Sequence, residues 1–151
     1  MVDVGAKAFT LRQAQARTRL LMSRAAMAAL ATGRVEKGDA LAVARLAGIQ
    51  AAKRTADWIP LCHPLPLDHV QVTIALDRRR NVATITSAVS ATARTGVEME
   101  ALVAALAAAA ALYDMLKAVD RAIVIEEAFV LEKRGGKSGA FVHPRAAGDA
   151  R

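Results

Sequence analysis

Cysteine is almost absent from this sequence, and aromatic residues are scarce. Cys62 is the single cysteine among 151 residues, so an intramolecular disulfide is excluded, which is typical of proteins in a reducing compartment. Aromatic residues make up only 3%, so the apolar core must be built mainly from Ala, Val and Leu. Helices with such small side chains pack closely, and another subunit often covers the surface that they leave open, so we expect an oligomer.

Long apolar runs and export signals are absent as well. The longest apolar run, residues 101–113, is well short of the ~20 residues that a membrane-spanning helix needs. The N-terminal residues contain Asp3 and Lys7 and lack the apolar stretch of a secretory signal. We therefore expect a cytoplasmic protein with no membrane partner.

Basic residues, in contrast, are in excess. The formal net charge of +7 favours phosphorylated or other anionic partners without identifying them. Hydrophobic residues make up 54% and charged residues 23%, as is typical of a globular chain. The length suits a single domain over residues 1–151, and we expect residues from about 144 to 151 to be a flexible tail.

The pattern of apolar residues and helix caps predicts an α+β fold. Residues 9–22 alternate small or apolar with charged side chains, as in an edge strand. Ser23 and Asp39 are typical helix N-caps, Gly33 is typical of a helix end, and three prolines exclude regular structure from residues 58–67. The further expected elements are a second helix to about residue 57, strands 69–76 and 81–91, a long helix 96–120 and a strand 123–131. This order indicates a ferredoxin-like antiparallel sheet packed against helices, with an extra short helix.

Cys62 and His63 lie on an extended segment that Pro60, Pro64 and Pro66 hold rigid. Such a loop is a sensible place for a histidine that faces a substrate, and a histidine hydrogen-bonded in the core fits the sequence equally well. A metal site is not expected, because one cysteine and three histidines match no standard zinc spacing. A nucleophilic Cys–His pair is not expected either, because neighbouring residues of an extended chain point to opposite sides.

Glu98 and Glu100 stand at the start of the long predicted helix. Residues 95–98 match a capping box, in which Glu98 reaches back to the Thr95 amide. At about 100° per residue the two glutamates project about 200° apart. They therefore line one pocket only if the helix starts late or a second subunit contributes, which we interpret as a mild indication of a site between subunits.

Asp114 and Lys117 stand three apart on the same helix and share a face. A surface ion pair of this kind is common and contributes little to stability. Leu112, Tyr113, Met115 and Leu116 surround the pair, however, and favour partial burial. In a partly buried pair each group shifts the pKa of the other, which is how acid–base pairs are prepared.

Several lysines stand beside glycines or helix starts. The GGKSG segment around Lys137 resembles the end of a phosphate-binding loop, but Leu131 stands where that motif needs glycine, and no helix is expected to follow. Lys137 therefore either contacts a phosphate or lies in a solvated tail. Lys37, before the Asp39 cap, and Lys53 with Arg54 are comparable candidate anion sites.

Five motifs occur in an order and spacing that point to a known family. They are AGIQAAKRT (residues 47–55), IPLCHPL (59–65), TGVEMEAL (95–102), YDMLKAV (113–119) and GGKSG (135–139). Together they resemble the MoaC family of cyclic pyranopterin monophosphate synthases. The similarity extends from residue 1 to about residue 139, nearly the whole chain.

The resemblance implies an assembly and a reaction. The implied assembly is a hexamer, a trimer of dimers with active sites at the dimer interfaces. The implied enzyme is a lyase of molybdenum cofactor biosynthesis. It converts 3′,8-cyclo-7,8-dihydro-GTP, made by a radical SAM GTP cyclase upstream, to cyclic pyranopterin monophosphate and pyrophosphate. No cofactor is implied, because no redox step is needed, and Mg²⁺ is expected only as a companion of the triphosphate substrate.

The same resemblance assigns roles by motif. Asp114, Lys117 and Lys37 resemble catalytic residues. The implied substrate-binding residues are Leu61, Cys62, His63, Glu98, Met99 and Glu100, with Lys53 and Lys137 as candidate phosphate ligands. The chain departs from the family pattern at Ala140, where an acidic residue is expected, at Arg94, which replaces a lysine, and at residues 121–122. The first departure puts the role of the loop's C-terminal edge in doubt.

A basic ferredoxin-like domain is also compatible with RNA binding. Such modules stack bases on aromatic residues of their central strands. The last predicted strand contains a single aromatic residue, Phe129, and lacks that pattern. We therefore favour the enzyme and expect no nucleic-acid partner.

Overall fold

The computed structural model describes residues 1–146 of the chain. Its elements are, in order, β1 (Thr10–Leu21), α1 (Arg24–Thr32), α2 (Ala40–Ala52), α3 (Thr55–Trp58), β2 (His69–Asp77), β3 (Val82–Ala93), α4 (Glu98–Leu116), β4 (Val124–Arg134) and β5 (Phe141–Val142). Of the predicted tail, residues 144–146 form a short 3₁₀ turn, and residues 147–151 lie outside the described part.

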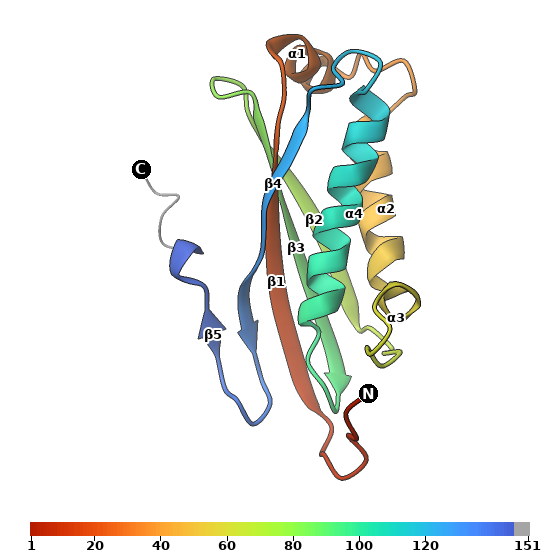
Figure 1. Ribbon diagram of the computed structural model, residues 1–151, viewed down its shortest axis with the longest axis vertical. Coiled ribbons are helices and arrows are strands. Elements are labelled where there is room, and N and C mark those ends of the chain that lie inside the picture. The colour runs from red at the N-terminus through yellow and green to blue at the C-terminus, as the bar shows by residue number, and fades with distance from the viewer. Residues whose placement is uncertain (147–151) are drawn as a thin grey trace.

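The strands form one antiparallel sheet in the order β2-β3-β1-β4-β5. Its four long strands have the ferredoxin-like order, and α2 and α4 lie side by side against one face of the sheet (Figure 1). This confirms the predicted α+β fold with an antiparallel sheet packed against helices.

The prediction of an edge strand at residues 9–22 is wrong. β1 lies between β3 and β4 and pairs with both along most of its length. Its alternation has another cause, because Ala14, Ala16 and Leu20 are buried beneath the helices while the arginines between them lie on the uncovered face. The charged residues therefore mark an open face of the sheet rather than an open edge.

The predicted caps of α1 and α2 are confirmed. The Ser23 hydroxyl accepts the Ala26 amide at the start of α1, Gly33 ends that helix with a φ of 68°, and the Asp39 carboxylate accepts the Ala42 amide at the start of α2. The expected continuation of α2 to residue 57 is wrong. The buried Thr55 hydroxyl donates back to the Ala52 carbonyl, and a separate short helix, α3, begins there.

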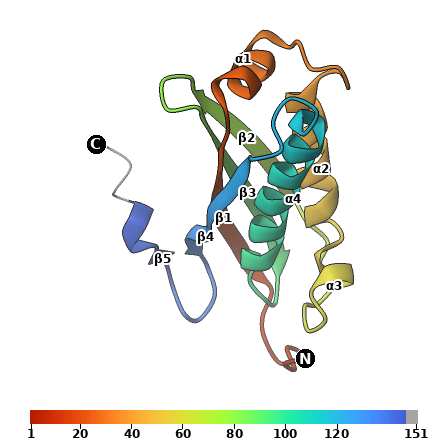
Figure 2. The same cartoon turned by 45° about the horizontal axis from the view of Figure 1, so that its top comes forward.

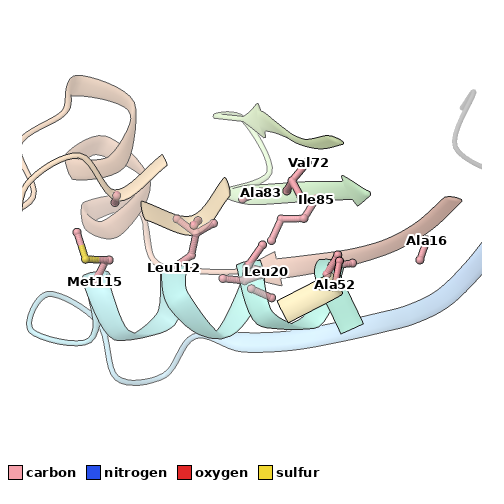
Figure 3. Close-up of a cluster of buried hydrophobic side chains, with 14 of the residues drawn as sticks. Ala16, Leu20, Ala52, Val72, Ala83, Ile85, Leu112 and Met115 are labelled. Carbon is pink, nitrogen blue, oxygen red and sulfur yellow. The ribbon is translucent and has the colours of Figure 1, made fainter. Parts of the chain in front are cut away.

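The core consists of small residues between two helices and the sheet, with Leu20, Ile85 and Leu112 as its largest anchors (Figure 3). α2 approaches α4 so closely that a Cβ atom on Gly48 would lie 2.7 Å from the Ala104 carbonyl oxygen. α4 is long and apolar enough to cross a membrane, but its apolar residues are mostly buried inside this fold, as expected of a core helix.

The two ends of α4 lie at opposite ends of the molecule (Figures 1 and 2). Its first turn lies near the N-terminal segment, the chain that follows α3, and the loop between β4 and β5. Its last turn lies near the connection between α1 and α2. Every site residue predicted from the sequence falls near one of these two ends.

Candidate active site

A cluster of two lysines and one carboxylate lies at the C-terminal end of α4. The Lys117 ammonium is 2.6 Å from Asp114 Oδ1, and the Lys37 ammonium is 2.7 Å from Asp114 Oδ2. Lys37 also donates to the Asp114 carbonyl oxygen at 2.9 Å, a group that the helix end leaves without an intrahelical partner. The structure thus brings together the three residues that the resemblance marks as catalytic.

The Asp114 carboxyl is held in its ionised form. Its pKa falls from 3.8 to about 2, because the hydrogen bond from Lys117 and then the one from Lys37 favour the carboxylate. The expected partial burial is wrong, because the Asp114 side chain is 54% exposed. Met115 and Leu116 do not cover the pair, because they project from the other side of the helix into the core.

A pocket of about 340 Å³ lies at the opposite end of α4. We call it the glutamate pocket. Its lining includes the predicted substrate-binding residues Leu61, Cys62, His63, Glu98, Met99 and Glu100. The predicted capping box is wrong, because Val97 is the N-cap and makes no side-chain cap hydrogen bond. The helix therefore starts late, at Glu98, and both glutamates line one pocket of one protomer, so their directions no longer argue for a second subunit.

Glu100 is the buried acid of the glutamate pocket. The residue is 4% exposed, and burial, with a smaller contribution from the Glu98 carboxylate, raises its pKa above the ordinary value. Burial, followed by the charge of Glu100, likewise raises the pKa of the Cys62 thiol. Cys62 therefore lines the pocket as a neutral thiol and is not a thiolate nucleophile.

A smaller hollow of about 310 Å³ adjoins the glutamate pocket and shares His63 and Glu100 with it. Lys53 and Arg54 also line it. Lys53 thus lies near the predicted substrate-binding residues, and the half-buried His63 lines two hollows rather than the core.

A larger pocket, about 660 Å³, borders the glutamate pocket and shares Lys7, Thr95, Gly96 and Glu98 with it. We call it the cationic pocket. Among residues 1–146, Glu98 is the one carboxylate in its lining, whereas six basic side chains line it: Lys7, Arg12, Arg94, Lys133, Arg134 and Lys137. Such a wall suits a ligand with several negative charges.

Sequence reasoning found Lys137 in this pocket and missed the other five basic residues as ligands. The signal was present, because β1 and β4 pair in antiparallel register with Gln13 opposite Arg134. That register brings Arg12 at the start of β1 beside the end of β4. The sequence did not reveal this proximity of Arg12 to β4, because it predicts an edge strand at residues 9–22.

Two glycines seat the GGKSG loop against β1. Gly135 and Gly136 have φ angles of 92° and 78°, and Cβ atoms there would lie 2.1 Å from the Leu11 carbonyl oxygen and 1.8 Å from Arg12 Nη1. The Lys133 ammonium donates to the Ser138 hydroxyl across the loop. β5 follows the loop, which agrees with the prediction that this segment is not a P-loop.

The two sets of predicted residues are far apart within one protomer. Glu98 and Asp114 are separated by sixteen residues of α4, or about 24 Å at about 1.5 Å per residue. Lys37, Asp114 and Lys117 therefore do not reach the glutamate pocket of their own chain. Within residues 1–146, no group of three or more His, Cys, Asp or Glu side chains is placed to hold a metal ion.

These features define an α+β domain equipped for acid–base chemistry on a polyanionic small molecule. The MoaC family matches residues 1–136 of the chain. Cyclic pyranopterin monophosphate synthase of Herpetosiphon aurantiacus is 58% identical over 95% of this chain and 88% of its own length. The enzymes of the same name from Heliobacterium modesticaldum and Chloroflexus aurantiacus are 51% and 50% identical, over 94% and 96% of this chain and 89% of their own lengths. The chain belongs to the MoaC family.

Proposed function

We propose that the chain is a cyclic pyranopterin monophosphate synthase of molybdenum cofactor biosynthesis. Its reaction converts 3′,8-cyclo-7,8-dihydro-GTP to cyclic pyranopterin monophosphate with release of pyrophosphate. The observation that carries this proposal beyond family membership is the cationic pocket, which adjoins the pocket of the two glutamates. A nucleotide-derived triphosphate needs a cationic pocket for its phosphates next to a pocket for its ring system.

The triphosphate occupies the cationic pocket, where Lys137 and the other basic side chains offset its charge. The ring system then lies in the glutamate pocket against Leu61, Cys62, His63 and Met99. Glu100, whose raised pKa favours the protonated form more than usual, is placed to exchange a proton or donate a hydrogen bond to the ring system. Lys53 approaches the same region from the adjoining hollow.

Lys37, Asp114 and Lys117 supply the remaining acid–base groups. With a pKa of about 2, Asp114 remains a carboxylate at neutral pH and is a weak proton acceptor. Its role is to orient the two ammonium groups, which donate protons or neutralise charge that develops on the substrate.

The active centre is shared between two copies of the chain. About 24 Å separates the lysine cluster from the glutamate pocket along one rigid helix, which supports a site in which the cluster of one copy meets the pocket of another. A two-fold dimer achieves this twice, once for each cluster. We propose a hexamer, a trimer of such dimers, as the assembly, and the cytoplasm as its location.

Direct assay of the product tests the function. The purified chain is incubated with 3′,8-cyclo-7,8-dihydro-GTP, made by a radical SAM GTP cyclase, and products are identified by mass. We expect cyclic pyranopterin monophosphate and an equal amount of pyrophosphate. Unchanged substrate in the presence of folded, assembled protein would contradict the proposal.

A further inference from the structure

Phe9 is a large aromatic side chain that stays 62% exposed just before β1. Its ring lies beneath the Arg94 guanidinium, whose central carbon is 4.7 Å from the ring centroid. A guanidinium on an aromatic face is held by the ring quadrupole and by flat stacking. The contact restricts a long, flexible cation to one orientation in the wall of the cationic pocket.

The protein leaves part of this guanidinium without an acceptor. Arg94 Nε is buried and has no hydrogen-bond partner among residues 1–146, and no carboxylate in that range forms an ion pair with Arg94. Because Nε is buried, a ligand oxygen can reach only the terminal nitrogens of Arg94, which are not among the buried atoms. The pocket that Arg94 lines already gathers five other cations.

The backbone beneath Arg94 is fixed as well. Arg12 Nε donates to the Ala93 carbonyl at 3.3 Å, and Arg12 Nη2 donates to the Arg94 carbonyl at 3.4 Å. Arg12 Nη1 lies directly under Gly136 of the GGKSG loop, where a Cβ atom would reach within 1.8 Å. The main chain of Arg94 and the loop that carries Lys137 both contact Arg12, so Arg12 fixes the backbone of Arg94 while Phe9 fixes its guanidinium.

We propose that Arg94, held by Phe9, is a specificity-determining residue of the cationic pocket and binds one phosphoryl group of a polyphosphate through its two terminal nitrogens. The proposal rests on the proposed function and assigns within it a residue that selects for phosphoryl oxygens rather than for negative charge alone. A lysine supplies the same charge without the planar pair of donors.

The test compares Arg94→Lys, Phe9→Leu and the double variant with the wild-type protein. Inorganic tripolyphosphate is titrated calorimetrically at fixed ionic strength, and steady-state rates are measured with the cyclised GTP substrate. Losing the charge-assisted fork should weaken tripolyphosphate binding about 10- to 100-fold in Arg94→Lys. KM should rise with little change in kcat, because the contact is made equally in the ground state and the transition state.

Phe9→Leu should weaken binding about threefold in the wild-type background and have little further effect in the Arg94→Lys background, because the ring acts through Arg94. Arg79→Lys, in the turn between β2 and β3, is the matched control and should bind tripolyphosphate as the wild type does. A melting temperature that falls in Arg94→Lys without any change in tripolyphosphate affinity would show a structural role and overturn the inference.

An Arg94→Lys variant with wild-type affinity and KM would also overturn it. In either case the proposed function would stand, provided that the wild-type protein still forms the product. If the wild-type protein formed no product, the proposed function would fail whatever its affinity for tripolyphosphate.

Discussion

Two inactive variants should restore activity to each other if each active centre is built from two copies of the chain. Lys117→Met removes the ammonium that lies 2.6 Å from Asp114, and Glu100→Gln removes the buried carboxyl of the glutamate pocket. Gln has the shape of Glu, and the unbranched Met is only one atom shorter than Lys, so both variants are expected to fold and assemble. Alone, each should lose about 100-fold or more in turnover, the range expected for loss of a general acid or base.

The expected recovery follows from the length of α4 and from symmetry. Lys117 and Glu100 are about 25 Å apart along the helix, so each centre of a two-fold dimer takes Lys117 from one copy and Glu100 from the other. A mixed dimer then contains one centre with both substitutions and one centre with neither. Random exchange makes half of the dimers mixed, so about a quarter of all centres regain the wild-type set of residues.

The assay uses differently tagged variants, co-expressed or mixed until subunits exchange, and purified on both tags before product is measured. The matched control pairs Lys117→Met with Asp114→Asn, two changes in the same cluster, which should not complement each other. Mixed assemblies of Lys117→Met and Glu100→Gln that stay as inactive as the single variants would refute the shared centre. Full activity of a strictly monomeric protein would refute it as well.

Three further predictions concern single residues. Asp114→Asn should stay folded and assembled and lose at least ~100-fold in turnover. In thermal melts this variant should be less stable than the wild type, by an amount that is constant above pH 3.8 and vanishes as the pH falls towards about 2. The reason is that the lowered pKa of Asp114 stabilises the folded wild-type protein only while the Asp114 carboxyl is ionised. His63→Ala should reduce turnover strongly at a nearly unchanged melting temperature, since His63 lines two pockets, and the opposite order would indicate a structural histidine. Gly48→Ala should destabilise the protein by ~1–3 kcal/mol in urea unfolding, because its Cβ would meet the Ala104 carbonyl, whereas a stabilised variant would show that the two helices have room.

The sequence predicted the elements whose signals are local. Ser23, Gly33 and Asp39 act at helix ends within a few residues of chain, and the structure uses each as expected. The edge-strand error arose because a distant partner decides: β1 looks like an edge strand until its pairing with β3 and β4 is known. The error at the end of α2 had a local cause, because the Thr55 hydroxyl donates to the Ala52 carbonyl and a separate helix begins where the side-chain pattern alone would continue.

The sequence likewise predicted some of the site residues and missed others. Asp114 and Lys117 are helix neighbours, so their contact follows from spacing, whereas Lys37 reaches them from another element and was linked to them only through the family resemblance. The cationic pocket was mostly missed, because it forms where strand ends and a loop meet. Sequence order separates Arg12 from Arg134 by most of the chain, and only the strand register brings them together.

α4 contains a run of alanines at residues 107–111, and this run bears on how far the length of the helix can change in evolution. An extra alanine is normally harmless in a helix, because alanine has the highest helix propensity. Here one added residue would turn the last turn of α4 by about 100° relative to the first and move it by about 1.5 Å. In the proposed dimer, each helix serves one centre with its first turn and the other centre with its last. A single inserted alanine would therefore disable both centres at once, and the number of residues in this helix is expected to be fixed more strictly than their identity.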